Sequence, residues 1–313
     1  MTKIHRSINT RKAALWILLA AVAVSCTPHK QRSAGHSADG TAAEASRANM
    51  PSSRTIASMA PSTTTILCAL GLGPSIITAD SWSAGTPGLP EEIPLFDMMK
   101  PDIELLASLE SGIMFVSAMT KEGTSKDPFK PLSDAGTEVV YIPTSGSIAE
   151  IKNDIALIAE KTGVQDKGTQ LVADMEKKIA EIRRITANIP ADQKKRVFFE
   201  ISPAPYIYSF GSGVFLNELV EYAGLVNILA EETGWLSVSA ETVAAADPDI
   251  IFTNVNYAGD PIPEILSRTG WEGVAAVRTG QVFYIDNNAS SQPAHTVVKA
   301  LEQMAKAAYP ELF

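Results

Sequence analysis

Residues 165–190 read "QDKGTQLVADMEKKIAEIRRITANIP", and this stretch predicts one long amphipathic helix near the middle of the chain. Its apolar side chains fall close to a single helical stripe: Val172, Met175, Ile179, Ile182 and Ile189. Pro190 ends the pattern, and no glycine- and proline-rich linker interrupts it. Because a continuous helix hinges poorly, we expect it to join two folded halves that move only slightly, with its stripe packed against both.

The segments on either side of this helix alternate between short apolar runs and helical stretches. Before it, the predicted strands are "RTIASM" (54–59), "SIITAD" (75–80), "GIMFVSA" (112–118) and "EVVYIP" (138–143). After it, they are "KRVFFEIS" (195–202), "DIIFTN" (249–254) and "QVFYID" (281–286). Predicted helices separate these runs, which is typical of a mostly parallel sheet with helices on its faces. The sequence therefore predicts an α/β fold of two Rossmann-like lobes, residues 54–163 and 191–313, joined by a helix within 164–190.

The first 25 residues are organised like a signal peptide. Arg6, Arg11 and Lys12 precede an apolar run, residues 13–24, that is too short for a comfortable membrane-spanning helix. Residues 23–26, "AVSC", resemble the lipobox of bacterial lipoproteins, in which the cysteine is acylated and becomes the new N-terminus. The resemblance implies a lipid anchor on Cys26, because two or three acyl chains hold a protein stably at a membrane. The alternative is an ordinary secretory peptide with an incidental cysteine.

The segment after Cys26 is small and polar, with almost nothing to bury. Residues 27–53 read "TPHKQRSAGHSADGTAAEASRANMPSS". Such a composition does not offset the entropy lost on ordering, so residues 26–53 are interpreted as the lipidated cysteine and a flexible tether.

Composition excludes several classes of function. The formal net charge is −9 without a basic patch, so a nucleic acid partner is not expected. Of four histidines only His295 lies in the predicted folded part, too few for a zinc or manganese site, so no metal ligands are expected. We find no G-x-S-x-G, P-loop or HExxH motif, and we do not expect an enzyme. Cys68, in the apolar "TTTILCALGLG", is interpreted as a buried, inert thiol.

Two α/β lobes joined by one helix behind a lipid tether resemble the solute-binding proteins of ABC importers. The likeness is to the helical-backbone class that serves vitamin B12, ferric siderophores and haem. It is carried by the order and spacing of five stretches, residues 56–73, 101–118, 196–228, 235–252 and 270–286. The resemblance implies a monomer without a resident cofactor, a ligand cleft between the lobes, and an ABC permease dimer with its ATPase subunits as partner. It also implies a lipid-anchored location facing outside the cytoplasm.

Two glutamates correspond to docking residues of this class. The resemblance implies that Glu104 in "PDIELLASL" and Glu241 in "SAETVAAA", one on each lobe, form salt bridges with arginines of the two permease subunits. Both are predicted near the start of a helix, where the dipole also favours a carboxylate, so a local capping role is the alternative.

The ligand is expected between the lobes, at loops that follow the strands. The candidate ligand-binding residues are Ser62, Trp82, Phe96, Tyr206, Tyr208, Trp235 and Asn256. Trp82 and Trp235 fall where vitamin B12 binders place aromatic side chains against the corrin ring. For Phe96 and Tyr208 a place in the core is an equally good interpretation.

Charge in the same loops favours a neutral ligand. Binders of anionic ferric chelates place arginines in the cleft, and these loops contain none. Where relatives often read R-x-G-P-R, this chain reads "SSQPAHT" (290–296), with His295 at the place of the second arginine. Thr65 stands where many relatives have a glutamate, and "AGLVN" (223–227) replaces a double-glycine turn.

A corrinoid is therefore the first hypothesis for the cargo, and a ferric hydroxamate siderophore or haem is the alternative. Haem would need a ligand for its iron, and the candidates are Tyr206, Tyr208, Tyr257 and His295. For His295 a cap at the start of the last helix is favoured over an axial ligand. A surface-anchored α/β enzyme is the remote alternative.

Overall fold

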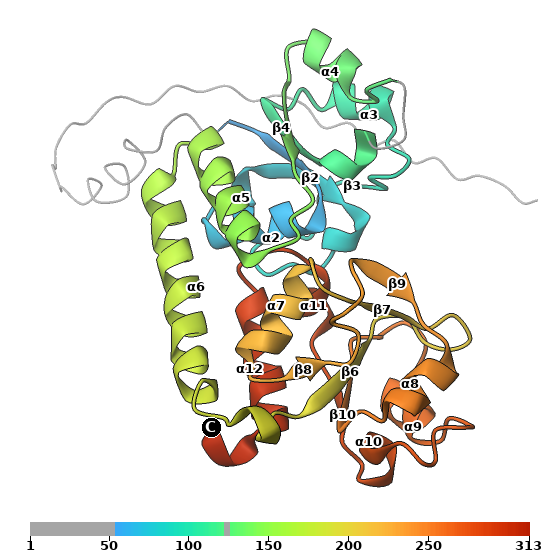
Figure 1. Ribbon diagram of the computed structural model, residues 1–313. Helices are drawn as coiled ribbons and strands as arrows, with labels where there is room; N and C mark the ends of the chain where they lie inside the picture. The colour runs from blue at the N-terminus through green and yellow to red at the C-terminus, as the bar shows by residue number, and fades with distance from the viewer. Residues whose placement is uncertain (1–53, 122–125) are drawn as a thin grey trace, which may run out of the picture. The chain divides into compact units, whose positions relative to one another are not determined.

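The computed structural model describes residues 54–121 and 126–313, which belong to one compact unit (Figure 1). The predicted signal peptide, Cys26 and the tether lie outside the described residues. None of the helices within the described ranges is both long and apolar enough to cross a membrane.

The first lobe is built on a five-stranded parallel sheet in the order β3-β2-β1-β4-β5. Its strands are β1 Ile56–Met59, β2 Ile76–Asp80, β3 Leu95–Phe96, β4 Ile113–Ser117 and β5 Glu138–Ile142. Its helices are α2 Pro61–Ala69, α3 Ile103–Ser108, α4 Lys130–Asp134 and α5 Ile148–Lys161, with short 3₁₀ turns at Gly73–Ser75, Ser81–Ser83 and Ala118–Lys121. Alternate side chains of β4 enter different clusters, Phe115 with α2 and α5 and Met114 with α3 and α4, so both faces are covered.

The second lobe repeats the pattern with a four-stranded parallel sheet in the order β11-β10-β6-β8. Its strands are β6 Arg196–Glu200, β8 Val226–Asn227, β10 Ile250–Thr253 and β11 Val282–Tyr284. Its helices are α7 Phe215–Tyr222, α8 Ala240–Ala246, α9 Pro261–Leu266, α10 Ala275–Arg278, α11 Asn287–Ser291 and α12 Val297–Ala308, with 3₁₀ turns at Ala191–Gln193 and Pro310–Leu312. The predicted α/β class with mostly parallel sheets is confirmed. An antiparallel pair, β7 Tyr208–Phe210 with β9 Trp235–Ser237, was not predicted.

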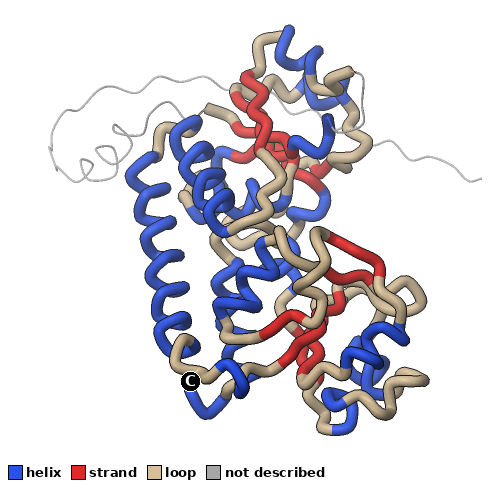
Figure 2. The backbone as a smooth tube through the Cα atoms, in the orientation of Figure 1, coloured by secondary structure: helices blue, strands red, loops and turns tan. Residues whose placement is uncertain are grey.

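The long helix α6, Gln165–Thr186, connects the lobes as predicted (Figures 1 and 2). It contacts α5 of the first lobe and both α7 and α12 of the second. Met175, Ile179 and Ile182 are buried in one hydrophobic cluster that contains residues of both sheets, and Val172 and Ile189 pack against it half-buried. One apolar stripe therefore ties α6 to both lobes.

Helix α6 ends at Thr186, before the predicted stop at Pro190. The Thr186 hydroxyl donates a 2.7 Å hydrogen bond to the carbonyl of Tyr222, at the end of α7. Gly224 follows α7 with a φ of +76°, and a Cβ there would lie 3.0 Å from the Thr186 Cβ. The single glycine of "AGLVN" therefore provides the left-handed turn and the close approach of α7 to α6.

Candidate ligand-binding site

A cavity of about 600 Å³ opens at the carboxyl ends of the first-lobe strands, and residues of both lobes line it. The first lobe contributes Ala60–Ser62 after β1, Met98 after β3, Ser117 at the end of β4 and Met119 after it, and Ile142–Gly146 at the end of β5. The second lobe contributes Gly213–Phe215, Gly234–Trp235 and Ser291–Pro293. Ligands of open parallel sheets bind at such strand ends. The predicted cleft between the lobes is confirmed, and its volume suits a bound small molecule.

The lining is uncharged. None of the described residues that line this cavity is an aspartate, glutamate, lysine, arginine or histidine. Large apolar side chains such as Met98, Met119, Phe215 and Trp235 share the wall with neutral hydroxyl and amide groups. The described lining residues can therefore stack against and hydrogen-bond a neutral ligand, and none of them supplies a countercharge for an anion.

Trp235 is an exposed aromatic side chain in the part of the lining that the second lobe contributes. Its ring meets the rings of Phe210 and Phe215 edge-on, with centroids 5.9 and 6.5 Å away. Both phenylalanines are buried, while 46% of Trp235 is exposed. Two fixed rings thus support an indole whose free surface is available for stacking. Ser62 and Trp235 are the sequence-predicted ligand residues that the structure places in the lining.

The other predicted ligand residues lie outside the lining. Trp82 is 78% exposed in the turn after β2, and its backbone N–H donates to the Asp80 carboxylate at 2.9 Å. Tyr206 is 80% exposed, Tyr208 lies half-exposed on β7, and Asn256 is exposed in the loop after β10. The structure therefore does not bring these four side chains into the cavity wall.

The prediction for Phe96 is corrected by the structure. Its ring is 8% exposed and packs in the cluster that contains Leu106 and Phe129. Successive side chains of a strand point to opposite faces, so in the two-residue β3 Leu95 is exposed and Phe96 enters the core.

The capping prediction for His295 is also wrong. Helix α12 begins after Thr296, which has a helical backbone conformation, and no side chain caps this end. Nδ1 of His295 is buried and has no hydrogen-bond partner among the described residues, and burial lowers the pKa of the imidazole. Neither His295 nor the exposed Tyr257 lines the cavity. The side chains considered as haem ligands are therefore not assembled around it.

The loop between β5 and α5, residues 143–147, is a part of the site that the sequence did not single out. The Ser145 hydroxyl donates a 2.5 Å hydrogen bond to the buried Asp154 carboxylate of α5. The N–H of Gly146 donates to Glu150 at 2.7 Å, and the N–H of Ile148 donates at 3.1 Å to Glu218, on α7 of the other lobe. The position of the loop at the end of a predicted strand was the available signal.

Glu104 and Glu241 occupy equivalent places in the two lobes. Each is the second residue after a capping side chain: Asp102 accepts from the Leu105 N–H at 3.0 Å, and Ser239 accepts from the Thr242 N–H at 3.1 Å. Both glutamates are exposed. Hydrogen bonds from its own backbone N–H and from Ser239 lower the pKa of Glu241. Because other residues cap the two helices, these carboxylates remain on the surface.

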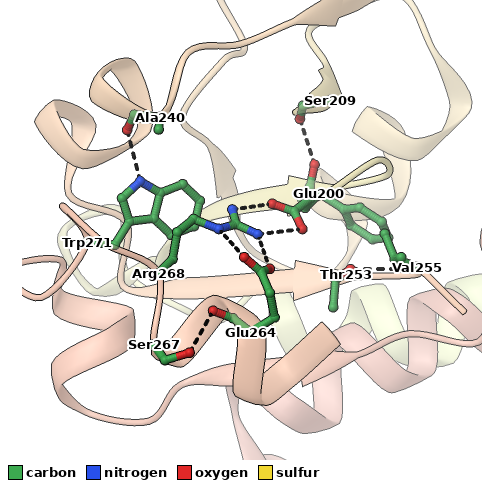
Figure 3. A network of polar contacts seen from close by, with 10 residues as sticks. Glu200, Ser209, Ala240, Thr253, Val255, Glu264, Ser267, Arg268 and Trp271 are labelled. Carbon is green, nitrogen blue, oxygen red and sulfur yellow. Dashed lines mark hydrogen bonds and ion pairs between the residues drawn. The ribbon is translucent and has the colours of Figure 1, made fainter. Parts of the chain in front are cut away.

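A buried ion-pair network holds the helix that carries Glu241 (Figure 3). Arg268 donates to Glu200, at the end of β6, at 2.6 and 3.1 Å, and also pairs with Glu264. Its guanidinium lies 4.2 Å over the Trp271 ring, and Trp271 Nε1 donates a 3.0 Å hydrogen bond to the carbonyl of Ala240. Trp271 thus links Ala240, the first residue of α8, to Arg268, which in turn pairs with Glu200 at the end of β6.

The fold and site can be compared with known proteins. The chain is 29% identical over 264 residues, covering 82% of itself and 81% of its relative, to the "Uncharacterized ABC transporter substrate-binding lipoprotein YvrC" of Bacillus subtilis strain 168. It is 27% identical over 243 residues to the molybdate-binding protein MolA of Haemophilus influenzae, covering 69% and 66% of the two chains. It is 24% identical over 250 residues to a vitamin B12-binding protein of Vibrio cholerae serotype O1, covering 80% and 87%.

Solved structures agree in fold. The periplasmic haem-binding protein RhuT of Roseiflexus sp. RS-1, in its apo form, is similar with a TM-score of 0.71 at 20% identity, covering 83% of this chain and 99% of RhuT. A sequence profile of the family described as periplasmic binding protein matches residues 56–289. Since that match spans most of the chain, the protein belongs to the periplasmic binding protein family and is the solute-binding component of an ABC importer.

Proposed function

We propose that this protein captures a corrinoid, such as cobalamin, outside the cytoplasm and delivers it to its permease without chemical change. The observation that carries the proposal is the uncharged cavity whose wall includes the supported ring of Trp235. A corrin is a broad, mostly apolar macrocycle with neutral amides around its edge. Flat aromatic surface and neutral hydrogen-bonding groups are the chemistry that holds such a ligand. The likeness to a vitamin B12-binding protein of Vibrio cholerae supports the same cargo.

The alternative cargoes fit the cavity less well. Haem carries two carboxylates, and burying them without a cationic partner is costly. Molybdate, the ligand in the name of MolA, is a compact dianion that a wide cavity without a cationic side chain does not enclose. A neutral ferric hydroxamate meets no charge conflict and is the second candidate, but it offers no flat ring to Trp235.

Trp82 belongs to this proposal as a rim residue. The neighbouring Ser83 hydroxyl donates a 2.9 Å hydrogen bond to Thr64, on the same helix as the lining residue Ser62. Most of the Trp82 surface is free, and the proposal places its indole at the mouth of the cavity. A macrocycle larger than the cavity reaches this ring from the mouth.

The direct test is calorimetric titration of the purified protein with cyanocobalamin, in parallel with haemin, ferrichrome and sodium molybdate. We expect heat of binding with cyanocobalamin at low micromolar concentrations or below, and quenching of tryptophan fluorescence. Absence of binding at tens of micromolar, together with tight binding of one of the other three ligands, would overturn the corrinoid assignment.

Several other features complete the proposal. Cys26 carries the lipid anchor, residues 27–53 tether the binding unit, and the protein acts as a monomer without a resident cofactor or catalysis. Glu104 and Glu241 dock on the permease. A Cys26→Ala variant tests the anchor, because it should leave the membrane fraction while keeping its ligand affinity.

A further inference from the structure

One hydrogen bond joins the two lobes at the wall of the cavity. The hydroxyl of Thr65, on α2 of the first lobe, donates at 2.9 Å to Oε1 of Gln292, just after α11 of the second lobe. Gln292 lines the cavity, and the two residues are 227 positions apart in the chain.

The amide of Gln292 is held on one side and open on the other. Its Oε1 accepts from Thr65, and its Nε2 lies 3.4 Å from Oδ1 of Asn288, one helical turn earlier. A carboxamide has two N–H donors and an oxygen with two lone pairs, so one donor and one acceptor site remain for a ligand. Ser62 is on the same face of α2 as Thr65, three residues earlier, and also lines the cavity. The polar groups around Gln292 are thus neutral.

We propose that Gln292, fixed by Thr65, is a specificity residue that recognises an uncharged carboxamide or hydroxyl edge of the ligand and disfavours a carboxylate edge. The assignment deepens the proposed function and rests on it for the nature of the macrocycle. A carboxamide of the ligand can donate to Oε1 and accept from Nε2, so both partners are satisfied. A carboxylate can only accept, and none of the described residues of the cavity wall provides a positive charge to offset its burial.

The competing explanation is that Thr65 and Gln292 only hold the lobes together. A second cross-lobe hydrogen bond separates the two roles, because Glu218 accepts from the Ile148 N–H at 3.1 Å but does not line the cavity. Glu218→Gln keeps the size of the side chain and weakens this lobe contact, and with it the contact of Glu218 with Tyr222, without changing the described lining. A purely structural role predicts the same behaviour for variants at both contacts.

The experiment measures ligand selection by calorimetry with wild type, Gln292→Arg, Thr65→Val and Glu218→Gln, each checked for folding by thermal melting. The probes are cyanocobalamin and cobyrinic acid, which lacks the nucleotide loop and carries carboxylates in place of the peripheral amides, together with haemin and haemin dimethyl ester. Wild type should prefer the neutral member of each pair at least tenfold. Gln292→Arg should reduce that ratio at least tenfold by gaining affinity for the carboxylates. Thr65→Val should weaken cyanocobalamin binding three- to tenfold, and Glu218→Gln should leave the ratio within twofold.

The outcomes separate this inference from the cargo assignment. If cyanocobalamin binds but Gln292→Arg leaves the ratio unchanged, or Glu218→Gln changes it equally, the role of Gln292 is overturned and the proposed function stands. If only haemin and its ester bind and the ester is preferred, the corrinoid assignment fails. The role of Gln292 in selecting an uncharged ligand edge then stands. Binding of none of the four macrocycles, or preference of wild type for the carboxylates, overturns the inference.

Discussion

Ser145, in the wall of the ligand cavity, forms a buried pair with Asp154 of α5. The Ser145 hydroxyl, 2.5 Å from the carboxylate, is the hydrogen-bond donor, and Asp154 is 4% exposed. Burial raises the pKa of Asp154 to about 6, with a smaller contribution from Glu150, while the hydrogen bond from Ser145 acts in the opposite direction. The native state therefore binds a proton on Asp154 more tightly than the unfolded state does.

This pair predicts a pH-dependent difference between wild type and Asp154→Asn. Because the folded pKa of about 6 exceeds the usual value, the stabilisation from protonated Asp154 is complete below about pH 4 and is lost as the pH rises through 6. Asparagine still accepts from Ser145 and never ionises. The unfolding free energy of the variant minus that of wild type should therefore rise by about 2–3 kcal/mol as the pH increases from 4 to 7.5.

Urea unfolding at pH 4.5, 6 and 7.5 measures that difference, in which other titrating groups common to both proteins cancel. Ser145→Ala is the matched control. It removes the hydrogen bond that favours the carboxylate, so it should lose more stability at pH 7.5 than at pH 4.5. Stability curves of wild type and Asp154→Asn that run parallel would show that Asp154 titrates normally.

The fold was predictable because its signals are local and repeated. The stripe from Val172 to Ile182 has the helical period, and the buried strands are continuous apolar runs between helices. Each signal covers several residues, so single exceptions do not change the interpretation. The antiparallel pair of β7 with β9 escaped prediction because each strand has three residues and both α7 and β8 lie between them in the chain.

The site was only partly predictable, because its residues come together through long-range contacts. Ser62 and Trp235 could be chosen from strand-end loops and from resemblance, and both line the cavity. Gln292 could not be chosen, since its hydrogen-bond partner is 227 residues away. For Phe96 the two-residue strand is too short to show an alternation, so the sequence did not distinguish a cavity residue from a core residue.

Aromatic stacking predicts that Trp235, in the lining, contributes more to cyanocobalamin affinity than Trp82, outside the lining. Trp235→Ala removes a ring supported by Phe210 and Phe215 in the wall, and we expect at least a tenfold loss. Trp82→Ala removes an exposed rim ring, and we expect a smaller loss of about threefold. Fluorescence or calorimetric titration measures both. Tyr284→Ala, an exposed aromatic outside the lining, is the control. A larger loss for Trp82→Ala than for Trp235→Ala would move the site to the rim.

The equivalent positions of Glu104 and Glu241 predict a separation of binding from transport. Charge reversal to arginine at either position should leave ligand affinity within twofold, because neither lines the cavity. Uptake of labelled ligand by cells should fall at least tenfold in the double variant, since like charges then face the permease. Glu272→Arg, which reverses the charge of another exposed acidic residue, is the control and should transport normally. Normal uptake by the double variant would exclude docking through these two residues.

The buried Glu200–Arg268 pair predicts a large and pH-dependent loss of stability when the arginine alone is removed. Burial raises the pKa of Glu200, and the hydrogen bonds and positive charge of Arg268 oppose that rise. Arg268→Leu leaves the 0% exposed Glu200 without its cation, and removing one partner of such a pair costs about 3–5 kcal/mol at pH 7. A carboxyl with a raised pKa contributes most stability at low pH, so the deficit should shrink as the pH falls toward 5.

Denaturant unfolding of Arg268→Leu and of the double variant Glu200→Gln/Arg268→Leu checks this prediction. Because the double variant leaves no unpaired charge in the core, while Glu264 is 46% exposed, it should recover at least half of the loss at pH 7. Both variants also remove the guanidinium that lies over Trp271, whose indole N–H holds Ala240 next to Glu241. Transport by the double variant should therefore stay below the wild-type level even where its unfolding free energy recovers. A deficit below about 1 kcal/mol that does not change with pH would mean that Glu200 is protonated in the wild-type protein.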